Sequence, residues 1–79
     1  MSKIYAIQVD WYTRKDGKLE YFDTYVCQKA YTSLMDAIHY VESECSTVTE
    51  TPNGWKGIQD DGTFHYIYKI RELDVEGDK

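Results

Sequence analysis

Four side chains in the sequence belong to the types that bind metals or act as nucleophiles: Cys27, Cys45, His39 and His65. A structural zinc site takes its ligands from closely spaced pairs, whereas these four are scattered along the chain. A catalytic cysteine needs an exposed thiol of low pKa beside an oriented base. Cys45 instead falls on the apolar side of a predicted helix, and Cys27 falls near the end of a predicted strand. We therefore predict no metal, no cofactor and no enzymatic activity, and we interpret both cysteines as reduced, buried thiols.

The remaining polar motif, "DDGT" at residues 60–63, carries two adjacent carboxylates. No calcium-loop spacing follows it, and the sequence has no glycine-rich phosphate loop. An Asp-Gly step tolerates the positive φ angles of a tight turn. The motif therefore predicts a hairpin turn rather than an ion site.

Aromatic residues are the strongest signal in the composition: 12 of 79, comprising eight Tyr, two Trp and two Phe. A chain of this length buries only about 60% of the surface that its unfolded form exposes, so its core must pack efficiently. Large rings serve that need, and Tyr can also lie half-exposed with its hydroxyl in water. Tyrosines on an open sheet face would form a partner interface, a self-association surface or a platform for stacked bases.

The net charge is −5, from 14 acidic and nine basic residues, which argues against general affinity for a nucleic-acid backbone. The stretch from residue 30 to residue 55 holds no Lys or Arg, and its acids are Asp36, Glu42, Glu44 and Glu50. We expect an acidic side of the molecule, which is typical of a charge pattern that serves solubility. The alternative is an acidic surface matched to a basic partner.

Hydrophobic periodicity predicts one α+β domain over residues 1–75. Alternating segments at 4–13 and 19–28 are typical of two strands, the segment 32–45 has one apolar stripe at helical spacing, and 55–59 and 63–73 are two further strands. The segment 46–53 is either an irregular connection or a short edge strand. The predicted fold is ββαββ, a four-stranded antiparallel sheet with one helix packed on one face. Residues 76–79 are expected to form a flexible acidic tail.

The register of the first hairpin decides which tyrosines face outward. A two-residue loop at Asp16-Gly17 puts Trp11 opposite Phe22 and Val9 opposite Thr24. It also sets Asp10 against Asp23, a like-charge pair that costs a few tenths of a kcal/mol. A three-residue loop with a bulged Gly17 would shift every partner. We expect the first register, which turns Tyr12, Tyr21 and Tyr25 outward and places Val26 under the helix.

The last predicted strand has two unlike faces. One carries the row Phe64, Tyr66, Tyr68 and Ile70, which is the more continuous apolar face. The other begins at His65 and is amphipathic. We expect the aromatic row to lie in the core under the helix.

Three stretches of the chain carry a resemblance in architecture and composition: "YAIQVDWYTRKDGKLEYFDTYV", "SLMDAIHYVES" and "GWKGIQDDGTFHYIYKI". The chain resembles small phage-encoded accessory proteins that disarm or redirect host machinery, including anti-CRISPR proteins. The resemblance implies a binder that occludes a site on a larger partner, often a basic nucleic-acid channel. For a phage-encoded protein it also implies the host cytoplasm.

We predict a non-enzymatic, acidic binding protein with a protein partner, such as a nuclease or a nucleic-acid-binding complex. Direct nucleic-acid or nucleotide binding on the aromatic sheet and a homodimeric structural module are the alternatives. The first residues lack the apolar core of a signal peptide and no apolar run approaches a membrane span, so a cytoplasmic protein without a membrane partner is expected. The predicted partner-binding residues are Tyr12, Tyr21, Tyr25, Glu42, Glu44, Glu50 and His65.

Overall fold

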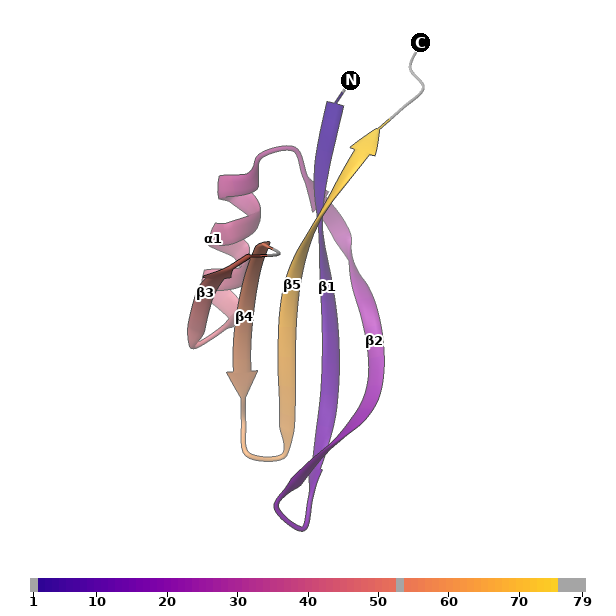
Figure 1. The fold of residues 1–79 in the computed structure, drawn as a ribbon, viewed down its shortest axis with the longest axis vertical. Helices are drawn as coiled ribbons and strands as arrows, with labels where there is room; N and C mark the ends of the chain where they lie inside the picture. The colour runs from indigo at the N-terminus through magenta and orange to yellow at the C-terminus, as the bar shows by residue number, and fades with distance from the viewer. Residues whose placement is uncertain (1, 53, 76–79) are drawn as a thin grey trace.

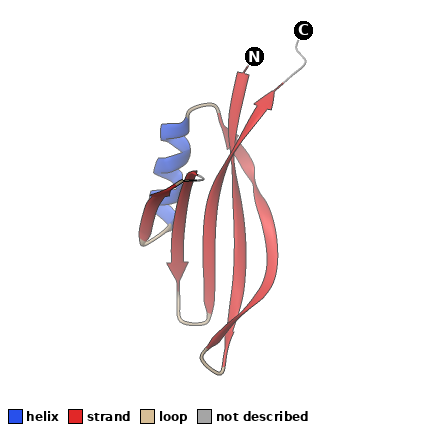
Figure 2. Cartoon of the chain, in the orientation of Figure 1, coloured by secondary structure: helices blue, strands red, loops and turns tan. Residues whose placement is uncertain are grey.

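The computed structural model describes residues 2–52 and 54–75. Five strands form one antiparallel sheet in the order β2-β1-β5-β4-β3, with one helix against it (Figures 1 and 2). The elements are β1 (Ser2–Lys15), β2 (Lys18–Tyr31), α1 (Leu34–Glu44), β3 (Thr47–Thr51), β4 (Gly54–Asp60) and β5 (Phe64–Val75).

The predicted α+β class is confirmed, but the predicted four-stranded sheet is wrong. The segment 46–53 forms the edge strand β3, which pairs with β4 from Thr47 opposite Ile58 to Thr51 opposite Gly54. Its run of Thr suits a strand, because β-branched side chains fit the pleated sheet. The expected tail at 76–79 lies outside the described residues.

The first hairpin turns at Asp16-Gly17 as predicted. Both residues have positive φ, 53° for Asp16 and 77° for Gly17, and the flanking Lys15 and Lys18 face each other. This is the two-residue turn whose twist matches the flanking strands. The predicted alternative of a bulged, three-residue loop is therefore excluded.

Beyond the turn, a bulge at Phe22 changes the predicted register. Tyr12 still faces Tyr21, but Trp11 faces Asp23, so Phe22 is the extra residue of β2. The shift removes the expected opposition of Asp10 and Asp23. It brings Thr24 opposite Asp10 instead, where the Thr24 hydroxyl donates a hydrogen bond of 2.7 Å to the carboxylate. A favourable polar pair thus replaces a like-charge pair.

The same bulge exchanges the faces of two predicted residues. Tyr25 lies opposite Val9, on the side that the helix covers, whereas Val26 lies opposite Gln8 on the other side. Directly opposed residues in an antiparallel pair share a face. The predictions that Tyr25 points outward and that Val26 lies under the helix are therefore wrong, because the one-residue insertion reverses the alternation.

The helix α1 begins as predicted at Ser33, whose side chain accepts a hydrogen bond of 3.4 Å from the Asp36 backbone N–H. It buries Ala37, Ile38 and Val41 against one face of the sheet, which we call the helix face. The opposite side is called the open face, because no described element covers it.

The core lies between α1 and the middle of the sheet. Ile7 and Val9 of β1 are fully buried there, and Tyr68 of β5 is 6% exposed. Tyr66 and Ile70 pack against this cluster. The prediction that the aromatic row of β5 lies under the helix is confirmed for Tyr68 and Ile70.

Gly57 of β4 lies directly beneath α1. A Cβ atom at this position would be 2.7 Å from Cys45 Sγ and closer still to Val41 Cγ1. The missing side chain therefore allows the helix to approach the sheet.

The molecule is elongated, with principal extents of 52 × 22 × 20 Å. An 11-residue helix is only about 16 Å long, so it covers a fraction of the helix face. Figure 1 shows α1 beside the upper part of the sheet, with the lower ends of β1, β2 and β5 extending beyond it. The uncovered lower part of the helix face contains the candidate site.

Candidate functional site

Four aromatic rings gather on the helix face beyond the end of α1: Trp11, Phe22, Phe64 and Tyr66. Trp11 lies at the centre, with ring centroids 4.3 Å from Phe22, 5.3 Å from Phe64 and 6.2 Å from Tyr66. We call these four rings the aromatic platform. Phe22 is 58% exposed, and the other three are half-buried. The platform is continuous with the core through Tyr66.

Local sequence and strand pairing together build the platform. Trp11 and Tyr66 are directly opposed on β1 and β5, and Phe64 comes one step further along the same face. The bulge supplies Phe22, because an extra residue in one strand re-aims its side chain.

Tyr25 lies between the platform and the helix. It is 45% exposed and shares the helix face with Val9. Partial burial, with added contributions from Tyr66 and Glu44 among others, raises the pKa of its hydroxyl above the usual value. Tyr25 therefore stays neutral at physiological pH and offers a hydroxyl at the edge of the exposed rings.

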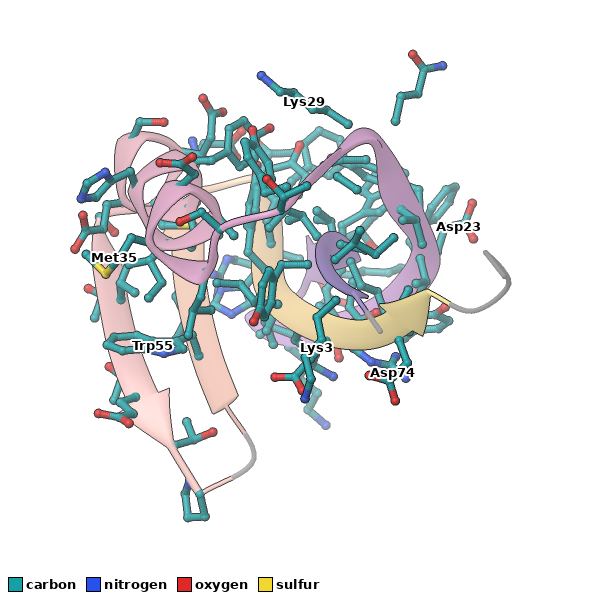
Figure 3. The ribbon with its side chains drawn as sticks, turned by 90° about the horizontal axis from the view of Figure 1, so that it is seen from above. Lys3, Asp23, Lys29, Met35, Trp55 and Asp74 are labelled. Carbon is teal, nitrogen blue, oxygen red and sulfur yellow. The ribbon has the colours of Figure 1, made fainter. Side chains whose placement is uncertain are left out.

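Two carboxylates border this surface. Glu44 ends α1, and no basic residue occupies the last turn of the helix. A carboxylate there opposes the helix dipole, so it does not stabilise the fold. Asp23 is the cross-strand partner of Trp11 and projects from β2 into solvent (Figure 3).

The negative charge of Glu44 reaches several groups of the helix face. Burial, together with Glu44, raises the pKa of the Cys45 thiol to about 11. Burial raises the pKa of Tyr40 to about 12, and both a hydrogen bond to Cys27 and the negative charge of Glu44 contribute to the increase. Glu44 thus adds a negative charge close to these groups at the helix end of the surface.

The structure separates the predicted partner-binding residues into two groups. Tyr12, Tyr21 and His65 meet on the open face, with the Tyr12 ring 5.7 Å from Tyr21 and 6.1 Å from His65. Tyr25 lies on the helix face instead, so the three predicted tyrosines do not form one surface.

The predicted acids are all exposed, and they come from the helix and the edge strand next to it. Glu42 and Glu44 belong to α1, and Glu50 belongs to β3. Of these, Glu44 is the one whose charge reaches Tyr25.

Sequence reasoning assigned the platform residues to the covered core and so missed them as a surface. The signal that could have found them is the length of the strands compared with the length of the helix. A strand of ten residues spans about 33 Å, whereas the predicted helix is about 20 Å long, so the ends of the aromatic rows must extend past it.

His65 on the open face is oriented by a carboxylate. Its Nδ1 is 2.9 Å from Asp60 Oδ2, and Arg14 pairs with the same oxygen. The hydrogen bond with His65 and one from the Gly62 backbone N–H lower the pKa of Asp60 below its usual value. Asp60 thus joins the end of β4 to His65 of β5 and to Arg14 of β1.

Asp10 is the most buried charged group, at 8% exposed. It accepts hydrogen bonds from Thr24 at 2.7 Å and from Gln8 at 3.2 Å, and Lys69 lies 2.9 Å away. Burial acts to raise the pKa of Asp10, but the three hydrogen bonds outweigh it and the pKa lies below the usual value. Asp10 is thus a satisfied ionic centre of the sheet.

The described residues contain no cluster of three or more His, Cys, Asp or Glu side chains placed to hold a metal ion. Cys27 and Cys45 are both free thiols. In the same part of the chain, no helix has the length and apolar character that crossing a membrane would require.

Comparison with protein-family models, with curated proteins and with solved structures gave no match for this chain.

Proposed function

We propose that the protein is a non-enzymatic binding module whose aromatic platform docks on a positively charged surface of a larger protein and occludes it. The observation that supports this proposal is the four-ring cluster on the uncovered part of the helix face, with Phe22 58% exposed. Contiguous apolar surface of this kind is unusual on a monomer and marks interaction sites. Aromatic anchors that become desolvated carry much of the energy of an interface.

A basic partner fits the groups around the platform. Lys and Arg side chains are attracted to the faces of aromatic rings. Glu44 and Asp23 add negative charge at two sides, which speeds and selects the encounter with a cation. A sheet that stacks nucleic-acid bases would instead interleave its rings with Arg and Lys.

Docking through the face is favoured over docking through the edge of the sheet. The exposed edge strand β2 has one irregularity at Phe22 and a second between Cys27 and Lys29. Bulges and lysines on an edge obstruct the addition of another strand. The platform, in contrast, needs no backbone pairing to be covered.

The test captures partners from an extract of cells that express the protein and identifies them by mass spectrometry. The bait is the wild type, Phe22→Ser or the matched control Tyr21→Ser, which removes an equally exposed ring from the open face. We expect a basic protein to be retained by the wild type and the control and lost from Phe22→Ser. Equal retention by both variants would contradict the platform as the docking site.

Light scattering on the purified protein tests the homodimer alternative. We expect a monomer. A dimer that Phe22→Ser dissociates would assign the platform to a second copy of the chain.

A further inference from the structure

A hollow lies where β4 and β5 separate. The two strands pair from Asp60 opposite His65 up to Lys56 opposite Lys69, and above that point β5 leans away from β4 (Figure 1). The hollow has a volume of about 480 Å³, within the usual range for small-molecule sites. It is lined by Gln8, Thr51, Trp55, Lys56, Lys69, Ile70 and Arg71.

Three cations gather at this hollow in a chain whose net charge is −5. Lys69 is neutralised by Asp10 at 2.9 Å. Arg71 donates a hydrogen bond of 2.7 Å to the side-chain oxygen of Gln8, which carries no charge. Lys56 is half-buried, and among the described residues no carboxylate forms an ion pair with Lys56 or Arg71. Two positive charges therefore remain uncompensated.

Lys56 lies directly opposite Lys69 across the β4–β5 pair, a relation in which like charges repel. Asp10 already offsets the charge of Lys69, so an anion held beside Lys56 would balance the charge that remains.

The hollow also has an apolar wall. Trp55, carried by the β3–β4 hairpin (Figure 3), and Ile70 line it beside the cations. Trp55 and Ile70 alternate with Lys56 and Arg71 along β4 and β5, so the apolar wall and the cations line opposite sides of the gap between the two strands. A ligand that fills the gap and carries both a planar ring and a dianionic group can contact both sides.

From these groups we infer that the hollow binds a small phosphate monoester bearing a planar ring, of the nucleotide class. Lys56 and Arg71 donate hydrogen bonds to the phosphate oxygens, and their two charges match the phosphate dianion. Trp55 and Ile70 contact the ring. The site is separate from the aromatic platform and does not rest on the function proposed for it.

The two tryptophans of the chain allow a test in which one reports on the site and the other is an internal control. In two-dimensional NMR of the ¹⁵N-labelled protein, adenosine 5′-monophosphate should shift the indole N–H signal of Trp55 and leave that of Trp11 in place. Adenosine and inorganic phosphate should each bind about tenfold more weakly or worse, because each supplies half of the contacts.

Lys56→Met should weaken the binding of adenosine 5′-monophosphate about tenfold or more, since it removes one charge-assisted donor. The matched control Lys15→Met makes the same charge change at the far hairpin and should bind as the wild type does. Without ligand, Lys56→Met should unfold at a temperature close to that of the wild type, because the substitution removes no ion pair with a described residue. Weak binding by this variant therefore cannot be attributed to misfolding.

No shift of Trp55 at millimolar nucleotide, or equal affinities of the wild type and Lys56→Met, would overturn the inference. Inorganic phosphate that binds as tightly as the nucleotide would overturn the role of the ring. A 5′-phosphorylated oligonucleotide compared at the same salt concentration identifies the source of the phosphate. If the oligonucleotide binds more tightly than the free nucleotide, the phosphate belongs to a nucleic-acid end. If the oligonucleotide binds more weakly, the phosphate belongs to a small metabolite.

Discussion

Substituting Gly57 by alanine tests how closely α1 approaches the sheet. The new Cβ would lie 2.7 Å from Cys45 Sγ and closer to Val41 Cγ1. Normal contacts between such atoms are near 3.5–4.0 Å, so the helix or the strand must move by about 1 Å. Gly57 is not among the glycines with positive φ. The expected loss therefore comes from packing and not from backbone strain.

The magnitude follows from two opposing effects. Overpacking a well-packed contact costs about 1–3 kcal/mol. Replacing glycine by alanine in an accessible backbone conformation returns about 0.4–1 kcal/mol by restricting the unfolded chain. We expect Gly57→Ala to lower the free energy of unfolding by about 1–2 kcal/mol, which is a decrease in Tm of about 4–16 °C for a domain of this size.

Urea denaturation of Gly57→Ala, Val41→Ala and the double variant measures the contact directly. Val41 is 1% exposed, so Val41→Ala alone leaves a cavity under the helix. In the double variant the new methyl group enters that cavity, and the combined loss should be smaller than the sum of the two single losses. Strictly additive losses, or a Gly57→Ala protein as stable as the wild type, would refute the reasoning.

Two further predictions concern ionisable groups. Because the pKa of Asp10 is lowered on folding, its charged form stabilises the protein above the unfolded pKa of about 3.9, and this contribution is lost as the pH falls through the folded pKa. We expect Asp10→Asn to be about 1 kcal/mol less stable than the wild type at pH 7 in urea denaturation and equally stable near pH 2; a difference that persists unchanged at pH 2 would contradict the role of the charge. Because burial raises the pKa of Cys45 to about 11, its thiol should react with a disulfide reagent at pH 8 at least about tenfold more slowly in the native protein than in urea, and equal rates would contradict that burial.

The features predicted correctly from the sequence are those set by neighbouring residues. The Asp16-Gly17 step dictates a two-residue turn, because those residues accept positive φ. Ser33 caps the helix because its side chain reaches a backbone N–H three residues ahead. The spacing of Ala37 and Val41 then selects the buried side of the helix.

The features that were missed depend on contacts between distant segments. The bulge at Phe22 forms where two strands would otherwise oppose Asp10 to Asp23, and local propensity does not distinguish a bulged strand from a regular one. The edge strand β3 exists because β4 offers it a partner. Its sequence alone was equally compatible with an irregular connection.

The candidate sites likewise depend partly on local sequence and partly on contacts between distant segments. By itself, the sequence determined that this short chain is rich in aromatic residues, that they alternate along strands and that acids accompany the helix. Only the tertiary structure decided which rings α1 covers, and which cations gather between β4 and β5. Periodicity assigns a residue to a face of the sheet, but exposure depends on how far the covering helix extends and on which charges the strand register brings together.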